Sequence, residues 1–176
     1  MDETRIVSAG LVAAVEETLA TAALRYFAPT GPFAEAVRAA TGVPLPGPLE
    51  ARQAPDAPII LAWRSPTETL CITRGADRLA DLLSRLAGAA DGCAVELTGG
   101  LGIVRLTGLR TADLLCRLGS TASAPEPGFA QRSRIADLPV LALSVRHGET
   151  LLAVDRAYLP HLLGWIRETL LDFDAA

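Results

Sequence analysis

Residues 59–97 read IILAWRSPTETLCITRGADRLADLLSRLAGAADGCAVEL, and this stretch sets the order of elements for the chain. Two apolar runs, residues 59–63 and 68–73, flank a Ser-Pro turn, which is typical of a β-hairpin. Residues 77–86 have the periodicity of an amphipathic helix. The leucines of its apolar face recur at positions 79, 82, 83 and 86. Residues 93–97 return to a short apolar run, so the stretch predicts β-β-α-β.

The preceding residues extend this order upstream. Residues 19–27 mix apolar and small side chains and are predicted to form a strand. A helix is predicted to begin at Pro32, where a missing N–H costs nothing, and to stop at Gly42 before Pro44. Residues 43–58 are rich in proline and are interpreted as a loop. Residues 19–97 therefore predict β-α-β-β-α-β, the split βαβ or ferredoxin-like order.

The second half nearly repeats this order. Residues 103–106 and 109–118 are predicted as a strand and a helix. Two strands then meet at His147-Gly148, and a helix closes the chain over residues 157–173. The expected fold class is α+β, with duplicated ferredoxin-like halves.

The predicted domain organisation is simple. Residues 19–176 are expected to form a single α+β domain made of two half-units, residues 19–97 and 101–173. The apolar residues of 1–18 fit a helix and a strand equally well, so the structure of this N-terminal segment is left open.

The composition excludes several classes of function. Half of the 176 residues are hydrophobic and the net charge is −4, which argues against nucleic acid as a partner. Every basic residue is arginine, so neither a Schiff-base lysine nor a P-loop lysine is available. The acidic start and the lack of an apolar run of about 18 residues predict neither a signal peptide nor a membrane span. The expected compartment is the cytoplasm.

The reactive side chains predict no catalytic centre and no metal site. Cys71, Cys93 and Cys116 lie far apart in apolar runs and are interpreted as small buried hydrophobic residues. His147 is expected to be solvated at a hairpin tip, and His161 to pack or to face a partner beside the apolar stripe of the last helix. The glycine-rich residues 99–102 join two strands, so a tight turn is favoured over a phosphate cradle.

Glu96 is the one weak candidate for binding a cofactor. It stands in a strand interpreted as half-buried, and Arg105 on the next strand is its predicted cross-strand partner. Trp63 and Trp165 stand out in a chain with few aromatic residues; core packing and a protein interface both remain open for them.

Three stretches in order resemble the gamma subunit of heterotetrameric sarcosine oxidase. Residues 62–70, AWRSPTETL, are similar to that family's Leu-Gly-Pro-Asp-Glu-Trp-Leu hairpin. Residues 104–115, VRLTGLRTADLL, resemble its Arg-Leu-Ser-Gly-Pro passage from strand to helix. Residues 154–166 resemble its closing helix. Residues 118–121, LGST, depart from the family's Gly-Cys-Pro-Leu-Asp run, which leaves room for another partner or substrate amine.

The resemblance implies a fold and a role. The family is related to the folate-binding domain of glycine-cleavage aminomethyltransferase. Its complexes oxidise the N-methyl group of sarcosine and pass a one-carbon unit to tetrahydrofolate. The resemblance implies a non-catalytic subunit that binds no cofactor, with FAD, FMN, NAD, zinc and tetrahydrofolate on the other subunits of a flavoprotein complex.

Two alternatives to this role remain open. The chain could be a stand-alone folate-binding or one-carbon module, for which Glu96 would have to hold the pterin ring. It could also be a homo-oligomer that buries its surplus apolar surface against a second copy of itself.

Overall fold

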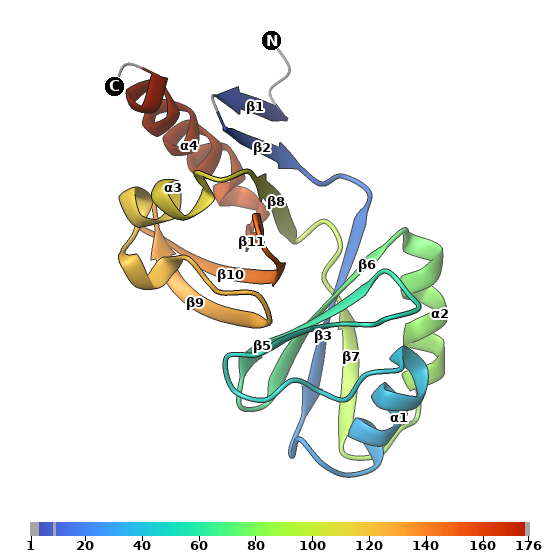
Figure 1. Cartoon of the computed structure of the whole chain (residues 1–176). Helices are drawn as coiled ribbons and strands as arrows, with labels where there is room; N and C mark the ends of the chain where they lie inside the picture. Colours follow the sequence, from blue (N-terminus) through green and yellow to red (C-terminus); the bar gives the residue numbers. More distant parts are fainter. Residues whose placement is uncertain (1–3, 9, 175–176) are drawn as a thin grey trace. The chain divides into compact units, whose positions relative to one another are not determined.

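The computed structural model describes residues 4–8 and 10–174, and they form two compact units, each with its own antiparallel sheet and two α-helices (Figure 1). Within the described residues, unit 1 comprises those up to Glu17, Gly99–Pro127 and those from Gln131 onward. Unit 2 comprises Thr18–Thr98 and Gly128–Ala130.

Unit 2 has the ferredoxin-like order that the sequence predicts. Its elements are β3 (Leu19–Tyr26), α1 (Pro32–Thr41), β4 (Ala51–Gln53), β5 (Ile59–Ser65), β6 (Glu68–Arg74), α2 (Ala76–Leu86) and β7 (Gly92–Glu96). The strands lie in the order β4-β5-β6-β3-β7, and each neighbouring pair is antiparallel. The hairpin β5–β6 and the helix α2 confirm the local predictions made from residues 59–97.

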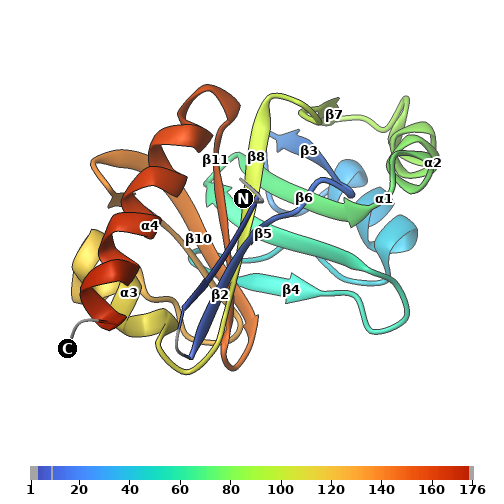
Figure 2. The ribbon, with the colours of Figure 1, turned by 90° about the horizontal axis from the view of Figure 1, so that it is seen from above.

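Helices α1 and α2 pack on one face of this sheet and enclose the core of unit 2 (Figure 2). Phe33 and Val37 from α1 meet Leu79 and Leu82 from α2 in this core. Helix α1 ends where predicted, because Gly42 takes the left-handed conformation (φ 79°) and its N–H donates to the Arg38 carbonyl at 2.9 Å.

Unit 1 is built around a six-stranded antiparallel sheet. Its elements are β1 (Arg5–Ser8), β2 (Leu11–Val15), β8 (Leu101–Thr107), α3 (Thr111–Leu118), the 3-10 turn η1 (Thr121–Ser123), β9 (Phe129–Ile135, whose first two residues belong to unit 2), β10 (Leu138–Arg146), β11 (Glu149–Asp155), the 3-10 turn η2 (Arg156–Tyr158) and α4 (Leu159–Asp174). The order is β1-β2-β8-β11-β10-β9, and α3 and α4 cover one face (Figures 1 and 2).

The N-terminal segment, left open from the sequence, supplies the strand that the second half lacks. The elements β8-α3-β10-β11-α4 form a ferredoxin-like half without its last strand. Strand β2 pairs antiparallel with β8 in the place of that missing strand, with Ala13 opposite Leu106. Strand β1 extends the sheet by one more strand. Residues 1–3 and 9 of this segment lie outside the described residues.

Two strands were not predicted, and both lie at sheet edges. Strand β4 falls in the proline-rich stretch interpreted as a loop, so that interpretation is wrong for Ala51–Gln53. Strand β9 reads FAQRSRI, with four polar residues in succession, and joins β10 through Ala136 and Asp137, which both have positive φ. Gly or Asn at such positions is the usual sequence signal for a hairpin turn, and this turn contains neither residue.

Candidate functional site

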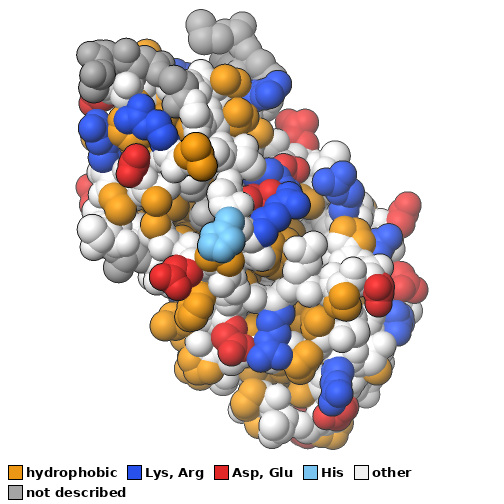
Figure 3. Space-filling view, viewed as in Figure 1, with side chains coloured by type: hydrophobic (Ala, Val, Ile, Leu, Met, Phe, Trp, Pro, Cys, Tyr) orange, Lys and Arg blue, Asp and Glu red, His pale blue; other side chains and the backbone are white. Residues whose placement is uncertain are grey.

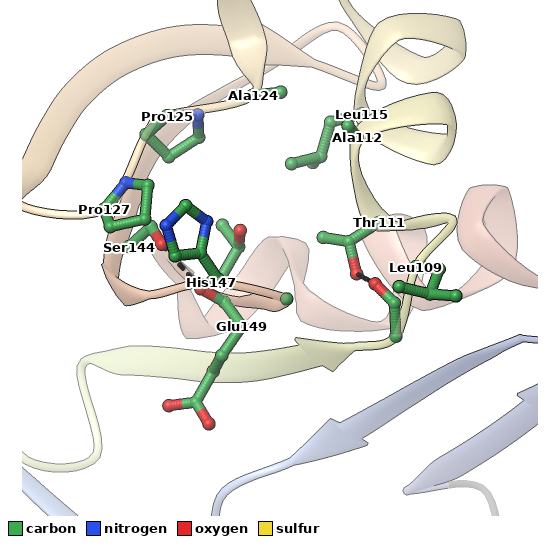
Figure 4. Close-up of a pocket in the computed structure, with 13 residues that line it drawn as sticks. Leu109, Thr111, Ala112, Leu115, Ala124, Pro125, Pro127, Ser144, His147 and Glu149 are labelled. Carbon is green, nitrogen blue, oxygen red and sulfur yellow. Dashed lines mark hydrogen bonds between the residues drawn. The ribbon is translucent and has the colours of Figure 1, made fainter.

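A pocket in unit 1 brings together His147 and three loops (Figure 4). It has a volume of about 290 Å³ and lies between the start of α3, the loop after η1 and the hairpin that joins β10 to β11. In Figure 4 the imidazole of His147 lies beside Pro125 and Pro127, facing Thr111 and Leu115 across the opening. His147 is exposed at the hairpin tip, as the sequence predicts, and it also forms one wall of a pocket, which the sequence did not predict.

The hairpin wall is held in shape by hydrogen bonds around a bulge. The register between β10 and β11 shifts between Leu143 and Arg146. Ser144 Oγ lies 2.9 Å from the Arg146 carbonyl oxygen and 2.8 Å from that of Glu149, so its hydroxyl donates to backbone across the bulge. The hydroxyl is therefore occupied by the backbone and is not paired with His147.

The opposite wall depends on Gly108. Its φ is 129°, and an added Cβ would lie only 2.1 Å from the Gly10 carbonyl oxygen, so no other residue fits without moving the backbone. The Gly108 N–H donates to the Gly148 carbonyl at 3.0 Å, which ties the start of α3 to the hairpin tip. The Thr111 hydroxyl donates to the Gly108 carbonyl at 2.9 Å.

The carboxylate of Glu149 points away from the pocket into an ionic cluster (Figure 4). Its side chain is only 8% exposed and accepts hydrogen bonds from Arg105 and from Arg146, whose Nε lies at 2.9 Å. Arg105 also pairs with Glu16, so the cluster links the end of β2 to β8 and β11. Because two arginines hold this carboxylate, it is a structural group and not a free general base for the pocket.

The predicted pair Glu96–Arg105 is wrong. The prediction assumed that β7 and β8 are neighbours because a short glycine-rich turn joins them. The two strands belong to different sheets, and β8 pairs with β2 and β11 instead. Glu96 is exposed on β7, an edge strand, and Arg105 binds Glu16 and Glu149.

The three cysteines differ, so their common interpretation as buried residues is correct only for Cys71. Burial raises the pKa of the Cys71 thiol to about 12. Cys116 on α3 is half-buried, and Cys93 is exposed on β7, which has a neighbouring strand on one side only.

The outer side of α4 carries an aromatic stripe. Tyr158, His161 and Trp165 follow one another at intervals of three and four residues, and all three are exposed. The rings of His161 and Trp165 meet edge to face at 6.4 Å. His161 therefore lies on the surface beside an aromatic neighbour. Trp63, in contrast, is half-buried at the end of the hairpin strand β5.

Residues 4–8 and 10–174 contain no group of three or more His, Cys, Asp or Glu side chains placed to hold a metal ion. Across the same residues, none of the helices combines the length and the apolar character needed to cross a membrane.

Comparison with solved structures places the fold. A chain of heterotetrameric sarcosine oxidase from Corynebacterium sp. U-96, in complex with pyrrole 2-carboxylate, superimposes with a TM-score of 0.83 over 99% of this chain and 90% of that chain, at 21% identity. The chain has a sarcosine oxidase subunit fold. Glycine cleavage system aminomethyltransferase T from Bartonella henselae matches with a TM-score of 0.67 over 93% of this chain but 46% of its own length, at 13% identity.

The likeness to sarcosine oxidase is one of fold. No protein-family model matches the sequence, and none of the curated proteins matches it. The comparison confirms the predicted α+β class with duplicated ferredoxin-like halves, which the aminomethyltransferase shares over about half of its length.

Proposed function

We propose that this chain is a non-catalytic subunit of a larger complex of the sarcosine oxidase type. The observation that carries the proposal is the extent of the fold likeness, which covers nearly all of both chains. A match of this extent supports a role like that of a subunit of a heterotetramer. The enzyme's FAD, FMN, NAD, zinc and tetrahydrofolate would then belong to partner subunits, and this chain would contribute contacts.

The surface of each unit supports a role in binding other proteins. Leu109 at the start of α3 is 97% exposed, Phe27 after β3 is 87% exposed, and Trp165 on α4 is 51% exposed. Figure 3 shows hydrophobic side chains reaching the surface in several places, next to arginine and acidic side chains. Large aromatic and aliphatic groups among arginines are typical of protein interfaces.

The polar groups of the His147 pocket favour binding over bond-making. The hydroxyls of Ser144 and Thr111 both donate to backbone carbonyls, and the Glu149 carboxylate is held by arginines. A nucleophile needs an adjacent base in hydrogen-bond reach, and these groups are committed elsewhere. The pocket is therefore better suited to accept a side chain or loop of a partner.

Purification of the tagged chain from its native host tests the proposal. We expect it to bring down a polypeptide with a flavin absorption spectrum, and the complex to produce hydrogen peroxide when sarcosine or another N-methyl amine is added. A chain that purifies alone, or with companions that contain no flavin, would refute the proposal. Turnover of an amine by the isolated chain would refute its non-catalytic part.

A stand-alone folate-binding module is the second candidate, because the fold also matches an aminomethyltransferase over 93% of this chain. The carboxylate this candidate needs was expected at Glu96, which is exposed on an edge strand and does not line the His147 pocket. Titration calorimetry with tetrahydrofolate distinguishes this candidate from the non-catalytic subunit. Saturable heat with the isolated chain would favour this second candidate.

A further inference from the structure

A second concave surface in unit 1 is lined by residues of the N-terminal segment and of η2 and α4. Figure 1 shows β1 and β2 beside α4. This groove has a volume of about 770 Å³. Its apolar lining consists of Val15 at the end of β2 and three residues of the first turns of α4, namely Leu159, Pro160 and Leu163. Leu159 and Leu163 are largely buried by the core beneath, so they form a floor and not a protrusion.

The helix flank that carries Pro160 and Arg167 of the groove extends further along α4. Pro160, Gly164, Arg167 and Leu171 follow at intervals of three and four residues and so lie on the same side of the helix. A Cβ added at Gly164 would meet no heavy atom within 4 Å, so the space over this residue is open. Leu171, further along, is 58% exposed. This exposed flank beside the groove is the lane that we expect a segment of a partner to follow.

Two arginines give the groove its charge. Arg156 and Arg167 both line it, and neither takes part in the ion pairs that form among the described residues. Glu17 also lines the groove and is exposed, so the described residues that line it carry two positive charges and one negative charge, on a chain whose net charge is −4. Elsewhere in unit 1, Arg105 binds two carboxylates of its own chain.

This combination of charges and apolar floor indicates the kind of occupant. A guanidinium presents parallel N–H donors that match a carboxylate, and such pairs are strong where the surroundings are partly apolar. A segment with acidic side chains beside an aliphatic one would place the carboxylates on Arg156 and Arg167 and the aliphatic group over Leu159 and Leu163.

We propose that this groove binds an acidic segment of a partner subunit. The inference rests on the proposed function, because it assigns the partner of that complex to one face of unit 1. The aromatic stripe of Tyr158, His161 and Trp165 lies on the opposite flank of α4, so the groove does not depend on it.

Charge reversal in the native complex tests the inference. Arg156→Glu combined with Arg167→Glu should weaken the affinity for the purified partner by about tenfold or more, because like charges replace attractive pairs. The matched control reverses Arg74 and Arg78 of unit 2, which are also exposed and outside the ion pairs of the described residues. This control should leave the affinity unchanged.

A steric variant checks the result without a change in charge. Gly164→Trp should fill the lane and weaken binding while leaving the melting temperature of the isolated chain unchanged, since the position is open. Ala80→Trp, on the exposed side of α2, is its control. A photo-cross-linking residue at position 164 should attach to an acidic segment of the partner, and reversing that segment's charge should restore binding to the double arginine variant.

The outcomes separate the groove from the proposed function. A wild-type chain that brings down no flavin-containing partner would overturn both. A partner that binds the wild-type chain and the double arginine variant equally well would overturn the groove alone. Cross-links to a second copy of this chain, or a small anionic lipid found in the groove by native mass spectrometry, would also overturn it.

Discussion

Cys71 and Cys93 differ in surroundings, and this difference predicts their reactivity. Cys71 lies in the core of unit 2, where burial raises its pKa to about 12, whereas Cys93 is exposed on β7. Because the thiolate is the reactive form, a disulfide reagent at about pH 8 should modify Cys93 in the folded protein and spare Cys71 until denaturant is added. In a Cys116→Ser background, which removes the half-buried thiol of α3, Cys93→Ser should abolish the rapid phase. Rapid modification of Cys71 in the native chain would contradict this description of the core.

The hydrogen bonds of Glu50 should make the free energy of unfolding depend slightly on pH. The Gly47 N–H donates to its carboxylate at 2.9 Å and Arg52 pairs with it, and these bonds hold the pKa of Glu50 below its usual value of 4.5. Because the pKa of Glu50 is lower in the folded state, the stabilisation is fully present above pH 4.5. It is lost as the pH falls through the pKa of the folded state. Its size should stay below about 1 kcal/mol because the pair is exposed.

Urea unfolding of wild type and Glu50→Gln checks this prediction. The difference in free energy of unfolding should be present at neutral pH and should shrink in acid. A difference that is independent of pH would show that the carboxylate does not act through its charge.

At the scale of elements, the ionic cluster joins strands that come from distant parts of the chain. Glu149→Ala removes the carboxylate that Arg105 and Arg146 share, and leaves the partly buried Arg105 with Glu16 alone. The free energy of unfolding should fall by about 2 kcal/mol. Arg134→Ala, which breaks an exposed pair with Asp137, should change it by less than about 0.5 kcal/mol. Equal effects of the two variants would show that the cluster contributes no more than a surface pair.

Replacing Gly108 by alanine should lower the free energy of unfolding more than the same replacement at other glycines with positive φ. Gly108→Ala brings a Cβ against the Gly10 carbonyl oxygen. The free energy of unfolding should therefore fall by more than about 3 kcal/mol. Gly148→Ala, also at positive φ but in open space, should cost about 1 kcal/mol. Thermal unfolding of both variants would measure the difference, and similar costs would mean that the backbone at Gly10 yields easily.

The elements predicted correctly are those whose signals are local. Helix α2 and the hairpin β5–β6 carry their periodicity and turn residues within one stretch, so the sequence predicts them closely. The pairing of β2 with β8 joins residues about ninety positions apart, so no local sequence pattern indicates it. The pocket was missed for the same reason, because its walls come from three separate segments that carry no motif. The error over Glu96 followed from treating neighbours in sequence as neighbours in the sheet.

At the scale of the whole molecule, the N-terminal strands and the two ferredoxin-like units give the chain a fold that matches 90% of a chain of heterotetrameric sarcosine oxidase. Leu109, Phe27 and Trp165 are exposed hydrophobic side chains on three separate segments, and each is available for contact with a partner. The His147 pocket and the α4 groove are both concave surfaces of unit 1, and both offer space to segments of another polypeptide.

The mass of the assembly isolated from the native host tests the central claim most directly. The chain alone has a mass of 18.4 kDa. Native mass spectrometry of the tagged chain, expressed at its natural level, should show a larger complex whose additional mass belongs to other polypeptides and their flavins. A mass equal to that of the single chain, or to a whole-number multiple of it, would contradict the claim.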